Sequence, residues 1–297
     1  MNVASASVLQ SRSRYSLSYA QIGVSALLLF ATLLLYARTI AGLVHEWWVD
    51  PDYSHGLLVP FAVAYLLYRK KDQLAKLPVR PAALGIAIIL FSQMLNLLGA
   101  LGAEFFLQRF SLLLFIAGGV LFLCGWKHLR QTSFALFLLL LAIPLPAIIF
   151  NMLALPLQFI ASTWAEGVLR FCSIPVYRDG NVLTLANQIL NVSEACSGIR
   201  SLMSLFTLAV MIAYFLRGQW WWRALFVASS VPIAIVANSI RVAGTGVLTL
   251  WFGPAAAEGF YHAFSGWVIF LIAFAVLSAE SMALQRWVVN RAPGAAQ

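Results

Sequence analysis

Long apolar runs separated by short polar segments dominate this chain, and they restrict the folds open to it. Nine such runs lie at roughly 21–44, 54–68, 82–101, 107–125, 132–150, 152–171, 198–216, 224–250 and 260–284. A helix that crosses a membrane needs about 20 mainly apolar residues, and most of these runs reach that length. We therefore expect an all-α, polytopic bundle of transmembrane helices, with residues 1–297 forming one membrane domain.

The composition favours lipid as the main solvent of this fold. The chain is 62% hydrophobic and 10% charged, whereas soluble domains carry about 25% charged residues. The net charge of +9 would suggest nucleic-acid binding in a soluble protein. Here the basic residues gather in the short segments between apolar runs, which is typical of cytoplasmic loops. We expect the lipid bilayer as a partner and no nucleic acid.

Charge also predicts which runs cross the membrane. Basic segments at 69–80, 127–130 and 217–223, and a tail with Arg286 and Arg291, are expected in the cytoplasm, and the acidic, aromatic segment 45–52 outside. The run from Ile22 to Val44 is too long for the core of a cleaved signal peptide, so it is read as a retained span.

If both termini are cytoplasmic, counting the apolar runs inward from each end of the chain leaves one run that cannot cross the membrane. The run 132–150 ends outside, and the run 198–216 must begin outside, so residues 152–171 start and finish on the same side. We expect that segment to lie in the outer interface or to fold back as a re-entrant pair. Eight spans remain, with both termini in the cytoplasm.

A small outer loop is predicted near 173–195. It holds the turn-forming pair Asp179–Gly180 and two short apolar runs, 182–185 and 189–192. This pattern is typical of a short hairpin.

Three chemically active residues converge on the outer side in this topology. Cys196 lies beside the start of the span at 198–216, Arg241 near the outer end of the next, and His262 at the start of the last. A helix N-terminus favours a thiolate, and a thiolate is a nucleophile whose proton a histidine can accept and later donate to a leaving amine. An arginine can stabilise the oxyanion of the tetrahedral intermediate.

Each residue has a plainer interpretation when taken alone. Cys172 and Cys196 are both predicted outside and are compatible with a structural disulfide, while Cys124 fits a small core residue. His262 fits a helix cap, and Arg241 fits a side chain that reaches toward lipid headgroups. Together these interpretations are weaker, because each residue would have reached the same face by coincidence.

The motifs around these residues resemble the exosortase/archaeosortase family. They are E-A-C-S-G-I-R-S (194–201), N-S-I-R (238–241) and H-A-F-S-G (262–266), with D-Y-S-H-G-L-L-V-P (52–60), I-P-L-P (143–146) and P-V-Y-R-D-G-N (175–181) upstream. The resemblance implies a bacterial inner-membrane cysteine transpeptidase with its active site on the outer, periplasmic side. By motif, Cys196 would be the nucleophile and Arg241 and His262 its partners.

The resemblance also implies the substrate. It would be a membrane-anchored protein whose C-terminal sorting signal combines a Pro-Glu-Pro-type motif, a transmembrane helix and a basic cluster, in the context of exopolysaccharide and surface protein sorting. The acceptor is unknown, and no cofactor or metal is expected, because the segment H-E-W-W-V at 45–49 is not a zinc motif.

Several further residues are expected to support the site. Glu194 would orient His262 or pair with Arg200, and Asn238 lies about one turn before Arg241. His55, in the D-Y-S-H-G motif, would line the site or cap a span, and Arg178 belongs to the P-V-Y-R-D-G-N motif. The alternative function is a transporter or export component for a polysaccharide or lipid, with Arg241 at a gate. In a third alternative, a non-catalytic scaffold, the group formed by Cys196, Arg241 and His262 would have no function.

Overall fold

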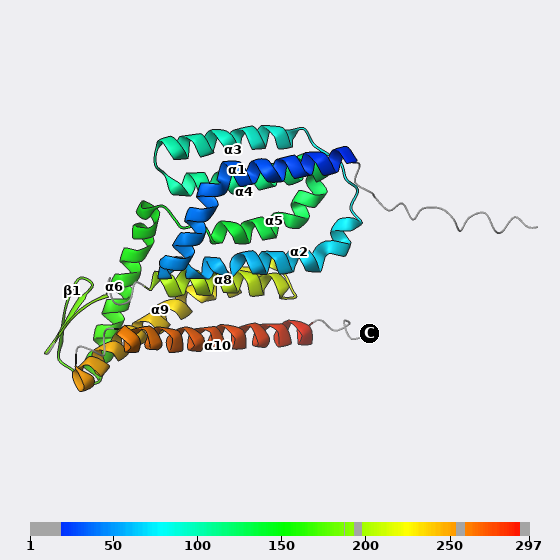
Figure 1. Cartoon of the computed structure of the whole chain (residues 1–297). Coiled ribbons are helices and arrows are strands. Elements are labelled where there is room, and N and C mark those ends of the chain that lie inside the picture. The colour runs from blue at the N-terminus through cyan, green and yellow to red at the C-terminus, as the bar shows by residue number, and fades with distance from the viewer. Residues whose placement is uncertain (1–18, 187, 193–197, 254–258, 292–297) are drawn as a thin grey trace, which may run out of the picture. The chain divides into compact units, whose positions relative to one another are not determined.

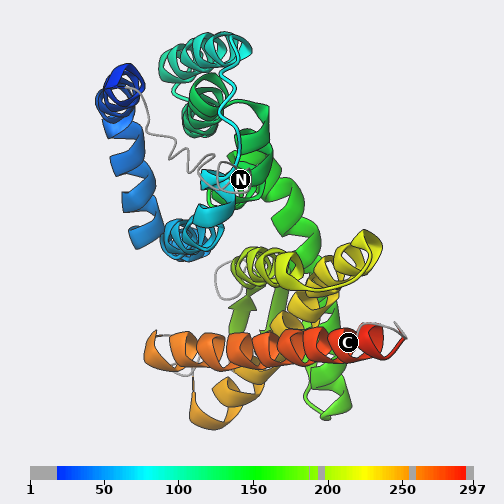
Figure 2. The ribbon, with the colours of Figure 1, turned by 90° about the vertical axis from the view of Figure 1, so that its right-hand side faces the viewer.

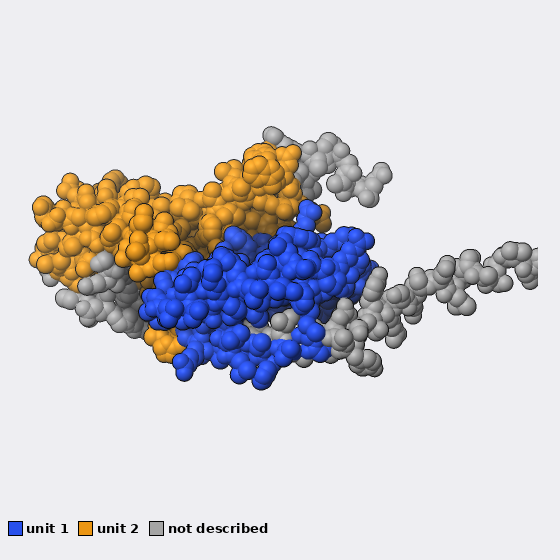
Figure 3. Space-filling model, turned by 90° about the horizontal axis from the view of Figure 1, so that it is seen from above, with its two compact units in different colours: residues 1–44, 60–140 blue, residues 45–59, 141–297 orange. Residues whose placement is uncertain are grey.

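The computed structural model describes residues 19–186, 188–192, 198–253 and 259–291 of the chain. The chain divides into two compact units, which Figure 3 distinguishes by colour. Unit 1 comprises residues 1–44 and 60–140, and unit 2 comprises residues 45–59 and 141–297. Every motif quoted above, except the last residue of the D-Y-S-H-G-L-L-V-P segment, belongs to unit 2.

Most of the described chain is α-helical (Figure 1), which confirms the predicted fold class. The helices are α1 (Tyr19–Val49), α2 (Val59–Ala75), α3 (Leu84–Leu101), α4 (Phe105–Cys124), α5 (Trp126–Leu141), α6 (Ala147–Phe171), α8 (Ile199–Phe215), α9 (Trp220–Phe252) and α10 (Gly259–Arg291). A 3-10 helix, η1 (Pro51–Leu57), precedes α2.

Five helical segments are long and apolar enough to cross a membrane. They are Leu84–Leu101, Phe105–Cys124, Ala147–Phe171, Trp220–Phe252 and Phe264–Trp287, and the shorter apolar helix Ile199–Phe215 joins them. These segments identify a multi-pass membrane protein. The count of eight spans stays a prediction.

Unit 1 is held together by small residues and a buried polar cluster. Helices α3 and α4 approach closely at Gly85, where a Cβ atom would lie 2.4 Å from the backbone nitrogen of Phe122. Close approach at small residues is the usual basis of helix packing in membranes. The hydroxyl groups of Tyr36 and Ser111 lie 3.1 Å apart, and the Gln93 amide donates to Tyr36 at 3.2 Å.

Unit 2 contains a three-stranded antiparallel sheet, ordered β1 (Val176–Asp179), β2 (Val182–Leu185) and β3 (Ile189–Asn191). Val182 pairs with Asn191 and Thr184 with Ile189, so the predicted hairpin is present and one further strand extends it. The sheet lies beside α6 (Figure 1). Its buried side chains form one apolar cluster with α6 and α9: Ala161, Ala165, Leu169, Leu183, Leu185, Leu190, Val192, Val242 and Ala243.

A second apolar cluster joins α8, α9 and α10, which pack against one another (Figure 2). Its buried members are Leu205, Ala209, Ala213, Leu216, Phe226, Ala234, Ala273 and Leu277. Helix α9 belongs to both clusters, so it is the element that fixes the sheet and the two neighbouring helices in one unit.

The structure corrects two expectations about residues 132–171. The run 132–150 is not one helix, because α5 ends at Leu141 and α6 begins at Ala147 after the turn that contains Pro144 and Pro146. Proline lacks a backbone N–H and restricts the residue before it to extended conformations, so two prolines in three residues end a helix. Residues 147–171 form one continuous helix that accommodates Pro156, and the alternative of a re-entrant pair is therefore wrong.

Candidate active site

The start of α8 packs directly on α9. Gly198 is the N-cap of α8 and has φ of +66°, a left-handed conformation that glycine adopts at little cost. A Cβ atom at Gly198 would lie 2.8 Å from the Nδ2 atom of Asn238, which is 4% exposed. Any side chain at Gly198 would displace Asn238, so glycine allows this close contact between the two helices.

Arg241 lies one turn further along α9 and packs on α10. It is 9% exposed, and a Cβ atom at Gly266 would lie 3.1 Å from its Nη2 atom and 3.2 Å from its Cζ atom. The guanidinium therefore lies flat against a helix surface that has no side chain at that point. Arg241 is buried among helices and does not extend along the protein surface, so the interpretation of a snorkelling side chain is wrong.

These two contacts bring three sequence motifs together. Gly198 belongs to the segment that contains Cys196, and Gly266 belongs to the segment that begins at His262. Both segments contact the same stretch of α9, between Asn238 and Arg241. The contacts of Gly198 and Gly266 are observed, and the convergence of Cys196, Arg241 and His262 themselves stays a prediction.

Not all the predicted residues lie among those that the structure describes. Glu194 and Cys196 fall within 193–197, outside the described residues. His262 belongs to the first turn of α10 by its backbone, and its side chain is outside the described part. Cys124 and Cys172 are free thiols among the described residues, and the alternative of a Cys172–Cys196 disulfide involves a residue outside them.

Arg200 joins the start of α8 to η1. Its Nε atom donates to the Oδ1 atom of Asp52 at 3.1 Å, and η1 packs against α8. The local sequence explains the geometry of η1, because the Asp50 side chain accepts from the backbone nitrogen of Asp52 at 2.8 Å and Pro51 occupies the first turn. Asp52 therefore fills the role of partner to Arg200 that the sequence also allowed for Glu194.

His55 holds the other side of η1 against the turn after α5. Its Nε2 atom lies 3.4 Å from the carbonyl oxygen of Leu141. Burial lowers the pKa of His55, and the backbone carbonyls of Leu141 and Asp52 oppose that effect. His55 is therefore neutral at pH 7, and its contact with Leu141 agrees with the structural support that the sequence allowed for it.

Trp47 also packs between η1 and the turn after α5. Its indole Nε1 atom donates to the carbonyl oxygen of Ala142 at 2.8 Å, and a Cβ atom at Gly56 would lie 2.3 Å from the same nitrogen. Burial also raises the pKa of the neighbouring Tyr53 to about 12, so its phenol stays protonated at neutral pH. Sequence reasoning missed Trp47 and Gly56 as a packed pair. The available signal was the glycine within D-Y-S-H-G, but nothing in the sequence indicates which ring lies on it.

Arg178 supports the sheet. Its Nε atom forms an ion pair with the Oε2 atom of Glu166 at 2.7 Å, and its Nη1 atom donates to the carbonyl oxygen of Gly180 at 3.0 Å. Glu166 also pairs with Arg170 at 2.7 Å. Arg178 thus fastens β1 to α6, and the structure gives it no contact with Asn238 or Arg241 among the described residues.

The described residues contain no group of three or more His, Cys, Asp or Glu side chains arranged to hold a metal ion. The chemistry that this part of the molecule offers consists of a buried guanidinium and a buried carboxamide on one face of α9, both touching the backbone of motif segments.

Comparison with known proteins gives one match. A family model described as a transmembrane exosortase matches residues 47–279. No curated protein and no solved structure matches the chain. The matched range begins at Trp47, and it includes η1, the sheet, α6 and the whole stretch of α9 that contacts Gly198 and Gly266.

Proposed function

Because this chain belongs to the transmembrane exosortase family, we propose that it is a membrane cysteine transpeptidase. Its substrates would be exported, membrane-anchored proteins with a C-terminal sorting signal, of Pro-Glu-Pro type followed by a transmembrane helix. The proposed setting is the bacterial inner membrane, with the site on the outer face and both termini in the cytoplasm.

One observation supports this proposal above the others. Asn238 and Arg241 are buried one turn apart on α9, and they contact Gly198 and Gly266 respectively. Gly198 is two residues from Cys196, and Gly266 is four residues from His262. A thiol, an imidazole and a guanidinium near one another are the groups that acyl transfer through a thioester requires.

The proposed reaction has two steps. The Cys196 thiolate attacks the scissile carbonyl carbon, a C–S bond forms, and Arg241 stabilises the oxyanion by hydrogen bonds. His262, which holds the thiol proton, protonates the leaving amine as the C–N bond breaks, and the C-terminal helix departs. An acceptor amine, or water, then attacks the thioester carbonyl and restores the thiol.

The decisive experiment is to trap the thioester. The protein is co-expressed with a model substrate that carries a sorting signal, and the purified protein is digested and examined by mass spectrometry. We expect a substrate fragment linked through its new C-terminus to Cys196. Cys196→Ser should abolish processing, because a hydroxyl with the same base is a far weaker nucleophile.

Cys172→Ala provides the matched control. Cys172 is an exposed, free thiol within the same unit, so its removal should leave processing within about twofold of the wild type, the scale of a neutral surface change. Equal loss of processing in Cys172→Ala and Cys196→Ser, or a substrate linked to another residue, would contradict the proposed nucleophile.

A further inference from the structure

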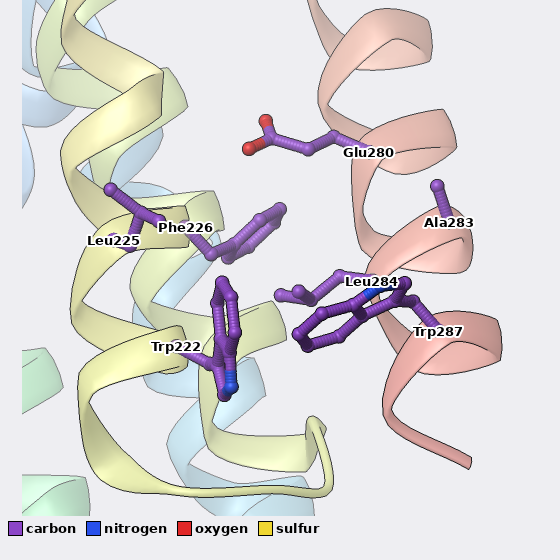
Figure 4. A pocket seen from close by; sticks show the side chains of 7 residues that line it. All are labelled: Trp222, Leu225, Phe226, Glu280, Ala283, Leu284 and Trp287. Carbon is purple, nitrogen blue, oxygen red and sulfur yellow. The ribbon is translucent and has the colours of Figure 1, made fainter. Parts of the chain in front are cut away.

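A second site lies at the other end of the α9–α10 pair. Between these helices is a hollow of about 320 Å³. Figure 4 shows its lining side chains, which come from both helices: Trp222, Leu225, Phe226, Glu280, Ala283, Leu284 and Trp287. Glu280 is 14 residues from Gly266, which corresponds to about 21 Å along a helix, so this hollow is separate from the candidate active site.

Glu280 is the unusual member of this lining. It lies within the apolar segment Phe264–Trp287, where a carboxylate is costly and usually functional. The Ser229 hydroxyl donates to its Oε2 atom at 2.7 Å and fixes the side chain toward α9. Among the described residues the Oε1 atom makes no hydrogen bond, so one carboxylate oxygen can accept from a ligand.

Aromatic rings line the rest of the hollow. The rings of Trp222 and Trp287 meet edge to face with centroids 4.6 Å apart, and Phe226 lies between them and Glu280 (Figure 4). The faces of aromatic rings attract cations, and tryptophan does so most strongly. A carboxylate beside such rings fits an ammonium group, which it can bind by both hydrogen bonds and charge.

The surrounding charges restrict the kind of cation. Arg217, Arg223 and Arg286 lie at this same end of the two helices, close in sequence to Trp222 and Trp287. This basic surface would repel a peptide with several lysines or arginines, but it would attract a phosphate. A ligand with one ammonium and one phosphate satisfies both Glu280 and the arginines.

The position also fits a lipid. Trp220 is 79% exposed, and exposed tryptophans beside basic residues are typical of the membrane interface. Leu225, which lines the hollow, and Val276, one turn before Glu280 on α10, are large, exposed apolar side chains that offer a surface for acyl chains. We propose that the hollow binds the headgroup of a phospholipid that carries a primary ammonium, with the ammonium on Glu280 in the hollow that Phe226, Trp222 and Trp287 line.

Native mass spectrometry of the full-length protein can test this proposal. Phosphatidylethanolamine and phosphatidylglycerol with identical acyl chains are titrated into the purified protein in detergent. We expect phosphatidylethanolamine to bind at least about 10-fold more tightly, the scale of one hydrogen bond to a charged group. Glu280→Gln keeps the shape and the acceptor for Ser229, and it should remove this preference. Equal binding of the two lipids to the wild type would overturn the proposal.

Two controls keep the result interpretable. Asp72→Asn, which removes an exposed acidic side chain from α2, should keep the full preference. N-acetyl phosphatidylethanolamine lacks the ammonium, and it should lose the advantage without any change to the protein, so the test holds even if Glu280→Gln fails to fold. A preference that survives acetylation, or a lysine-rich peptide that displaces the lipid only when Glu280 is present, would also overturn the proposal.

Discussion

At the scale of single residues, Arg241 is a charged group that is buried between helices of the fold. A central arginine costs about 2.5–3.5 kcal/mol on an insertion scale, yet this one is 9% exposed and lies against the bare backbone of Gly266. The planar guanidinium fits a flat surface, whereas the ammonium of lysine is a point charge on a flexible stem. This packing predicts that the shape of the Arg241 side chain matters as well as its charge.

Arg241→Lys separates shape from charge. If Arg241 provides oxyanion hydrogen bonds, the lysine variant should enter the membrane normally and process substrate about 10²–10³-fold more slowly, the usual effect of losing one such donor. The measurement is single-turnover processing, with alkylation of Cys196 as a check that the thiol is still reactive. Near-normal processing would leave Arg241 only its charge, and loss of the protein from the membrane would make it a structural residue.

Gly266→Ala tests the packing itself. The added Cβ atom would lie 3.1 Å from the Nη2 atom of Arg241, so the guanidinium must shift by a few tenths of an ångström. Since displacements near 1 Å cost about 10²-fold in rate, we expect a several-fold slower reaction with little loss of expression. Gly244→Ala is the matched control, because nothing lies within 4 Å of its Cβ position. Similar rates in the two variants would separate Gly266 from the site.

The motif residues on α9 were predictable from sequence, but their partners were not. Asn238 and Arg241 are three residues apart on a helix, so a shared face follows from helical periodicity. The contacts with Gly198 and Gly266 depend on how α8 and α10 approach α9, which is decided by the apolar cluster that includes Leu205, Ala234 and Ala273. The same limit applies to Asp52 and Arg200, whose pairing depends on packing between η1 and α8.

At the scale of secondary-structure elements, the sequence predicted the hairpin but not the end of α5. The hairpin was predictable, because Asp179–Gly180 supplies a turn and Leu183, Leu185 and Leu190 alternate with exposed positions. The end of α5 was missed, because apolar character continues through I-P-L-P while the backbone cannot stay helical there. A hydropathy pattern predicts which segment is surrounded by lipid or apolar side chains, but it does not predict where the backbone hydrogen bonds of a helix end.

The 3-10 helix η1 gives a prediction about pH. Burial lowers the pKa of His55 below its ordinary value near 6.5, so the unfolded chain binds a proton more readily than the folded one. Folding is therefore favoured above pH 6.5, and this contribution is lost as the pH falls below 6.5 toward the lowered pKa. We expect η1 to exchange its amide hydrogens faster at pH 5.5 than at pH 7.5, after correction for intrinsic exchange rates.

His55→Asn is the comparison for that measurement. It removes the titrating group, so the corrected exchange of η1 should no longer rise at acidic pH. His45 lies outside η1 on α1, and His45→Asn should keep the wild-type pH profile. An unchanged profile in His55→Asn would assign the effect to another group.

At the scale of the whole molecule, sequence predicted the multi-pass helical fold, and the sidedness of the loops stays a prediction. In a cysteine-free background, a single cysteine at Asp179 should react with a membrane-impermeant maleimide added to intact cells, and one at Gln73 should react only after the membrane is opened. Both positions are exposed in the structure, so burial cannot explain a difference. External labelling at Gln73 would reverse the proposed orientation and remove the site from the outer face.

The contacts of η1 also fix an order of events during synthesis. Its bond partners are distant in the chain: 86 residues separate His55 from Leu141, and 148 separate Asp52 from Arg200. At typical rates of translation the second interval lasts roughly 7–30 s. Residues 45–59 therefore leave the ribosome long before the segments that cover them, and unit 2 can close only after unit 1 has been made. A chaperone or insertion factor that protects residues 45–59 would therefore bind them only between the synthesis of Asp52 and the synthesis of Arg200.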